Sequence, residues 1–135
     1  MRNDQPTYQF YLTSDRALRP RHRELPNGDV EFAIKSAEAF LVERDGGLAV
    51  VYPGVRIAIP CKSPAELVFS RPDWMPRGVG VTALVDGPQG DLLVYVINQT
   101  DMSLEVRRGA WLLKGLVRKR PDVPWWQKLL CWIVR

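Results

Sequence analysis

Residues that bind metals through sulfur or nitrogen are scarce in this sequence of 135 residues. Cys61 and Cys131 are the two cysteines, they form no CxxC pair, and His22 is the single histidine. A structural zinc site needs about four such ligands, so this kind of site is excluded. No apolar run approaches the roughly 18 residues of a membrane-spanning helix, and the opening MRNDQPTYQF lacks the apolar core of a secretory signal. We therefore expect reduced thiols in a cytoplasmic or nuclear protein.

Sustained helical periodicity is also missing before residue 124. Eleven prolines and ten glycines interrupt the chain, which favours short strands and turns over long helices. Alternating or short apolar runs predict ten strands, at 8–12, 30–34, 40–42, 48–52, 55–59, 65–69, 79–85, 92–97, 104–106 and 111–117. The basic stretch 13–26, which contains two prolines, is expected to be a loop. Strands spaced by about 8–12 residues predict an all-β sandwich or barrel.

Positive charge is gathered in two stretches of a chain whose net charge is +4. One holds Arg16, Arg19, Arg21 and Arg23; the other holds Arg107, Arg108, Lys114, Arg118, Lys119 and Arg120. A solvated surface is the ordinary explanation of such stretches. Contact with an anionic lipid, a nucleotide or a nucleic acid is the alternative, and we do not expect a nucleic acid.

The last residues differ in composition from everything before them. A basic linker with two prolines precedes Trp125, Trp126 and Trp132, so three of the five tryptophans fall in the last eleven residues. Pro124 suits the first turn of a short helix. We therefore divide the chain into a β domain, residues 1–121, and a tryptophan-rich C-terminal tail, residues 122–135.

Six short segments, taken in their order along the chain, are informative as a series. They are GDVEF at 28–32, VYPGVRIAIP at 51–60, FSRP at 69–72, VGVTALVD at 79–86, VYVINQT at 94–100 and LEVRRG at 104–109. In this order the region from about residue 8 to about 121 resembles the trimeric dUTPase family, whose fold is a small jelly-roll β-barrel. Segments 28–32, 69–72 and 79–86 correspond to the family's first three motifs. Segment 104–109 leads to residues 110–114, where the fourth motif stands.

The resemblance implies which residues would take part in catalysis. In the family, the aspartate that ends the third motif activates a metal-assisted water, which attacks the α-phosphate of the nucleotide. Asp86 fills this place if one residue has been lost after it; otherwise Val85 does. Asp86 also opens the sequence Asp-Gly-Pro-Gln-Gly, in which an aspartate is common for turn formation alone. Ser70 and Arg71 match the second motif in reversed order, and with Asp86 they are the vestigial catalytic candidates.

The remaining motifs depart further from the family. Pro88 or Gln89 replaces the tyrosine that packs on the deoxyribose, and Ala110 and Lys114 replace the aspartate and glutamine of the fourth motif. The glycine-rich fifth motif, which closes over the phosphates in the family, is missing, and the tryptophan-rich tail stands in its place. We therefore expect a catalytically inactive protein without a cofactor. An active dUTP pyrophosphatase that uses Mg²⁺ and a noncatalytic nucleotide sponge or sensor are the two alternatives.

At this length the chain resembles the adenoviral early-region-four adaptors encoded by the first reading frame. That resemblance implies host-protein binding, signalling, self-association and a place in the host-cell cytoplasm, near a membrane. The dUTPase family implies a homo-oligomer in the form of a trimer; without a shared active site, a dimer or a monomer is the alternative. The adaptors that bind PDZ domains end in a Ser/Thr-x-hydrophobic motif. This sequence ends Trp132-Ile133-Val134-Arg135, so we do not expect PDZ binding.

The tail has three alternative uses. Its apolar residues Leu129, Leu130, Ile133 and Val134 would pack on a neighbouring subunit, or the tail would form a protein-binding helix. Otherwise it binds an anionic membrane surface, because tryptophans suit the headgroup region and cations suit anionic lipids. The residues that would make the membrane or partner contact are Trp125, Trp126, Lys128, Trp132, Arg118, Lys119 and Arg120, with Cys131 open to acylation.

Overall fold

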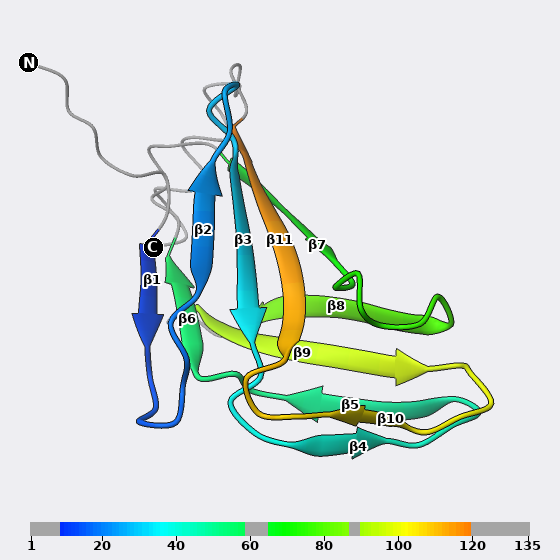
Figure 1. The fold of residues 1–135 in the computed structure, drawn as a ribbon. Helices are drawn as coiled ribbons and strands as arrows, with labels where there is room; N and C mark the ends of the chain where they lie inside the picture. The colour runs from blue at the N-terminus through cyan, green and yellow to red at the C-terminus, as the bar shows by residue number, and fades with distance from the viewer. Residues whose placement is uncertain (1–8, 59–64, 87–89, 120–135) are drawn as a thin grey trace, which may run out of the picture.

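The computed structural model describes residues 9–58, 65–86 and 90–119, and within these residues the chain is built from strands alone (Figure 1). The eleven strands are β1 (Gln9–Leu12), β2 (Arg21–Glu24), β3 (Val30–Lys35), β4 (Phe40–Val42), β5 (Gly47–Val51), β6 (Val55–Ala58), β7 (Ala65–Ser70), β8 (Val79–Asp86), β9 (Asp91–Asn98), β10 (Leu104–Val106) and β11 (Trp111–Lys119). Ten of them fall on the predicted strands, so the all-β prediction is confirmed.

Strand β2 corrects the prediction of a loop between β1 and β3. Arg21–Glu24 pairs antiparallel with β3, with Arg21 opposite Ala33 and Glu24 opposite Val30. All four residues of β2 are polar and exposed, so no apolar alternation marks the strand in the sequence. Its pairing depends on backbone hydrogen bonds and on the turn at Gly28, whose N–H donates to the Leu25 carbonyl at 2.9 Å.

The strands form three antiparallel sheets. The first has the order β1-β6-β9-β5, with β8 on the other edge of β9; the second has the order β2-β3-β11-β7; the third pairs β10 with β4. In Figure 1, β3 and β11 run crosswise to β9 and β5. Val94, Val96, Ile34, Leu112 and Leu113 are fully buried in one core cluster, which also takes in residues of β4, β6, β8 and β10.

The C-terminal predictions fall beyond the part of the chain that the structure describes. These are the tail 122–135 with its short helix, and the individual residues Arg120, Trp125, Trp126, Lys128, Cys131 and Trp132. Strand β11 ends at Lys119, and Arg118 in that strand is exposed. Over residues 9–58, 65–86 and 90–119, no helix has the length and apolarity needed to cross a bilayer.

Candidate functional site

The outer face of the β2-β3-β11-β7 sheet carries a polar and aromatic surface whose layout follows from strand register. Inward positions such as Phe32 and Val117 are buried in the core, and the alternate positions point outward. One outward row crosses all four strands through Arg21, Ala33, Lys114 and Ser70. The next row crosses them through Arg23, Glu31, Leu116 and Val68.

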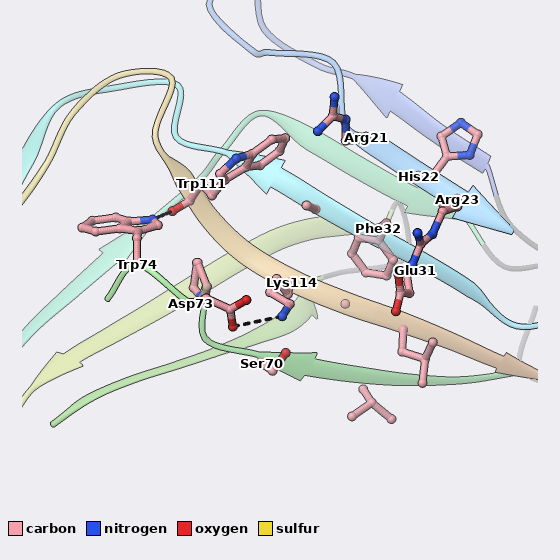
Figure 2. Close-up of a pocket in the computed structure, with 15 residues that line it drawn as sticks. Arg21, His22, Arg23, Glu31, Phe32, Ser70, Asp73, Trp74, Trp111 and Lys114 are labelled. Carbon is pink, nitrogen blue, oxygen red and sulfur yellow. Dashed lines mark hydrogen bonds and ion pairs between the residues drawn. The ribbon is translucent and has the colours of Figure 1, made fainter. Parts of the chain in front are cut away.

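These rows form the floor of an open groove of about 980 Å³ (Figure 2). The connection from β7 to β8 adds Asp73 and Trp74 to its wall, and the start of β11 adds Trp111. The groove therefore collects side chains from segments that are up to 95 residues apart, from Arg21 to Leu116. We call it the sheet groove.

Two ion pairs cross the sheet groove. The Arg23 guanidinium lies 2.7 Å from the Glu31 carboxylate, and the Lys114 ammonium lies 3.2 Å from the Asp73 carboxylate. All four side chains are substantially exposed to solvent. Exposed pairs contribute at most about 1 kcal/mol each, so a ligand carrying its own charges can replace these partners at low cost.

Two tryptophans are held at one end of the sheet groove. The Trp74 indole N–H donates to the backbone carbonyl of Trp111 at 2.7 Å, and Figure 2 shows the two rings near each other. The Lys35 ammonium and the Arg21 guanidinium lie 5.0 Å and 5.8 Å from the centre of the Trp111 ring. These are cation–π distances. The two rings are therefore fixed in place, while Trp74 remains 43% exposed.

The sheet groove brings together two segments that resemble dUTPase motifs and the segment that stands in the place of a third. Glu31 comes from the first, Ser70 from the second and Lys114 from the segment that replaces the fourth. Arg71 does not line the groove. Its half-buried guanidinium donates to the Met75 carbonyl within its own loop.

Asp86 lies elsewhere, at the end of β8 opposite Asp91 of β9. Its exposed carboxylate accepts a hydrogen bond from the Tyr52 hydroxyl at 3.4 Å. Partial desolvation and the charge of Asp86 raise the pKa of Tyr52, so this phenol stays protonated as the donor around neutral pH. Ser70 and Asp86 therefore belong to separate surfaces of one chain. Pro88 and Gln89 lie outside the described residues.

The described strands and loops hold no cluster of three or more His, Cys, Asp or Glu side chains suited to a metal ion. Asp86 and Asp91 are cross-strand partners in β8 and β9, and the Arg56 guanidinium lies 3.3 Å from the Asp91 carboxylate.

The sequence did not identify Trp74, Trp111 or Tyr52 as site residues. Arg21 and Arg23 belonged to a recognised basic stretch, but their outward alignment requires β2 to be a strand. The two-residue spacing of these arginines was the available signal, since alternate residues of a strand share a face. Nothing local in the sequence indicates that Trp74 meets Trp111, because 36 residues separate them.

Comparison with known proteins gives a structural likeness and no sequence match. No family profile matches the chain, and neither does any curated protein. The fold does match solved structures, among them a variant of the dUTPase from phage phi11 of S. aureus, whose study concerns the coordination of a structural Mg(II) ion. The TM-score is 0.60 at 17% identity, over 87% of this chain and 95% of the phage chain. The chain therefore has the dUTPase jelly-roll fold.

Proposed function

We propose that this chain is a catalytically inactive protein of dUTPase fold that binds a host protein through the sheet groove, as an adaptor resembling the adenoviral ones. The observation that carries the proposal is the composition of the groove: two fixed tryptophans, exposed arginines and exchangeable ion pairs. Tryptophan and arginine are the side chains most enriched at the energetic centres of protein interfaces. Trp74, Trp111 and Arg21 are the expected centre of this contact.

The state of the second-motif residues supports the loss of catalysis. A phosphate-binding arginine needs a free, forked guanidinium, whereas that of Arg71 is bonded to the carbonyl of Met75. Lys114 stands where the family has a glutamine, so a cation replaces a neutral amide at that position. The second-motif arginine therefore has a partner within the chain, and the fourth-motif position has a different chemistry.

Asp86 gives further support. A general base must reach the proton that it removes. The exposed carboxylate of Asp86 instead accepts a hydrogen bond from Tyr52, and Asp86 does not line the sheet groove.

Pyrophosphate release from dUTP in the presence of Mg²⁺ tests the inactive assignment. We expect the same background rate for the full chain and for its Asp86→Asn variant. Turnover by the full chain above that of the variant would overturn the proposal in favour of an active pyrophosphatase. Calorimetric titration with dUTP, dUMP and ATP addresses the sponge or sensor alternative, for which we expect no binding heat.

The groove contact is tested by affinity purification from host cells with quantitative mass spectrometry. Trp74→Ala removes an exposed ring of the sheet groove, and Met102→Ala removes an exposed side chain in the β9–β10 connection, which does not line it. Proteins bound by the native chain should be lost by Trp74→Ala and kept by Met102→Ala. An unchanged partner set with Trp74→Ala contradicts the assignment of the groove.

A further inference from the structure

The outer face of the first sheet is apolar over three adjacent strands. Its cross-strand rows join Leu48 of β5 to Ile97 of β9 and Gly80 of β8, then Val50 to Tyr95 and Thr82, and finally Leu93 to Leu84. None of these eight positions carries a charge. We call this surface the β5–β9–β8 face.

Much of this face is open to solvent within the described structure. Leu48 is 58% exposed, Leu84 55% and Val50 47%, and Tyr52, which follows β5 directly, is 60% exposed. Soluble proteins rarely leave contiguous apolar patches of more than a few hundred Å² uncovered, and those that do generally use them for contact. The β5–β9–β8 face therefore calls for a covering group.

We propose that residues 122–135 of the same chain cover the β5–β9–β8 face. This segment is itself apolar, with the residues Trp125, Trp126, Leu129, Leu130, Trp132, Ile133 and Val134. Each tryptophan has about 150–250 Å² to remove from water. Contact between this apolar segment and the β5–β9–β8 face removes the apolar side chains of both from water.

Charge favours this face over the sheet groove as the docking place. The segment carries Lys128 and Arg135 against Asp122. The outer face of the β2-β3-β11-β7 sheet has more cations than carboxylates: Arg21, Arg23, Lys35, Lys114 and Arg118 against Glu31, Glu66 and Asp73. The β5–β9–β8 face is uncharged, and the row at its end carries the carboxylates of Asp86 and Asp91 against the guanidinium of Arg56. This net negative charge suits a cationic segment.

Reach and tethering favour contact within one chain. Sixteen residues follow Lys119, the end of β11, because 135 − 119 = 16. Fully extended, they span about 50 Å, whereas a domain of this size has a radius of gyration of about 14 Å. A short tether holds its segment at an effective concentration in the millimolar range. Docking in the same chain therefore outcompetes docking on another copy at ordinary protein concentrations.

Cys131 allows a direct test by disulfide trapping. In a Cys61→Ser background, Thr82→Cys places a thiol at the centre of the β5–β9–β8 face, and Ser70→Cys places one in the sheet groove. Both native residues are small, polar and exposed, so both variants should fold. Lys114 in the row beside Ser70 favours the thiolate at that position, which makes the control stringent.

After mild oxidation with diamide, we expect Thr82→Cys to give an intramolecular disulfide with Cys131 at least tenfold faster than Ser70→Cys. Non-reducing electrophoresis and peptide mapping measure it. Equal rates at the two positions, or no disulfide with Thr82→Cys, would overturn the proposal. Covalent dimers through Cys131 would overturn it in favour of docking on a second copy.

A second measurement uses no new cysteine. The chain ending at Pro121 should bind the apolar dye ANS several-fold more than the full chain, because its β5–β9–β8 face is uncovered. Equal dye binding by the two chains contradicts the proposal. The Thr82→Cys chain is also mixed with anionic liposomes. If it floats with them and no longer forms the disulfide in the same sample, the proposal is overturned and the segment binds lipid instead.

Discussion

Asn98 is a buried amide whose hydrogen bonds join three segments. Its side chain is 0% exposed at the end of β9. The amide nitrogen donates to the carbonyls of Val42 at 3.1 Å and Met102 at 2.8 Å, and the amide oxygen accepts from the N–H and the hydroxyl of Thr100. Every polar atom of this side chain is therefore satisfied, and one residue fixes both β4 and the β9–β10 connection.

Asn98→Ala should lower the free energy of unfolding by about 2–3 kcal/mol, because the carbonyl of buried Val42 loses the amide donor and the Thr100 N–H loses its acceptor. Urea denaturation followed by fluorescence measures the change. Gln99→Ala, next to it and exposed, should change stability by less than about 0.5 kcal/mol. A similar loss in both variants would argue against the role of the amide.

Gly115 and Phe32 are cross-strand partners, and the Phe32 ring occupies the space that a side chain at position 115 would need. A Cβ at Gly115 would lie 2.0 Å from the Phe32 ring. Gly115→Ala should cost about 1–3 kcal/mol through overpacking. Adding Phe32→Leu should make the alanine less costly, a non-additivity that a double-mutant cycle in urea detects. Strict additivity would contradict the direct clash.

At the scale of the element, the β2–β3 hairpin shows how a polar strand is held. Its turn needs Gly28 at φ 88°, and Asn27 supports it by accepting from the N–H of Asp29 at 3.0 Å. The hairpin in turn sets Arg21 and Arg23 on the sheet groove. The turn therefore positions the groove as well as the strand.

Gly28→Ala should lower stability by about 1–2 kcal/mol, since a side chain disfavours the left-handed backbone. Gly80→Ala is the matched control: Gly80 lies in β8 with nothing within 4 Å of the added Cβ. We expect that change to be neutral or slightly stabilising. Thermal melting of both variants compares them, and equal losses would refute the turn argument.

At the scale of the whole molecule, apolar side chains remain exposed outside the β5–β9–β8 face. Tyr11, Leu12, Leu41 and Met102 are 44% to 73% exposed. Burial of such residues between copies would remove apolar surface from water. Self-association, proposed as a trimer from the resemblance, would use surfaces of this kind.

For a trimer, light scattering after size-exclusion chromatography should give three times the mass of one chain. Leu41→Lys, on the edge of the β10–β4 pair, introduces a charge where Leu41 is 55% exposed. A single-chain mass at all protein concentrations would contradict self-association. A trimer unaffected by Leu41→Lys would place the contact elsewhere.

The sequence predicted most strands because burial in a sheet alternates residue by residue. Val30, Phe32 and Ile34 of β3 show that alternation, and all three are buried. Strand β2 was not predicted, because its four residues are polar and show no such alternation. The order of six short segments predicted a dUTPase-like jelly roll, and the structural match shows that fold.

What the sequence by itself determined is local: the strands, the turns at glycine and proline, the scarcity of metal ligands and the tryptophan-rich tail. The tertiary structure alone decided which side chains meet. Register places Arg21, Lys114 and Ser70 in one row, turns Arg71 to Met75 and separates Asp86 from the sheet groove. Register depends on pairing between strands far apart in the chain, and no short-range periodicity encodes it.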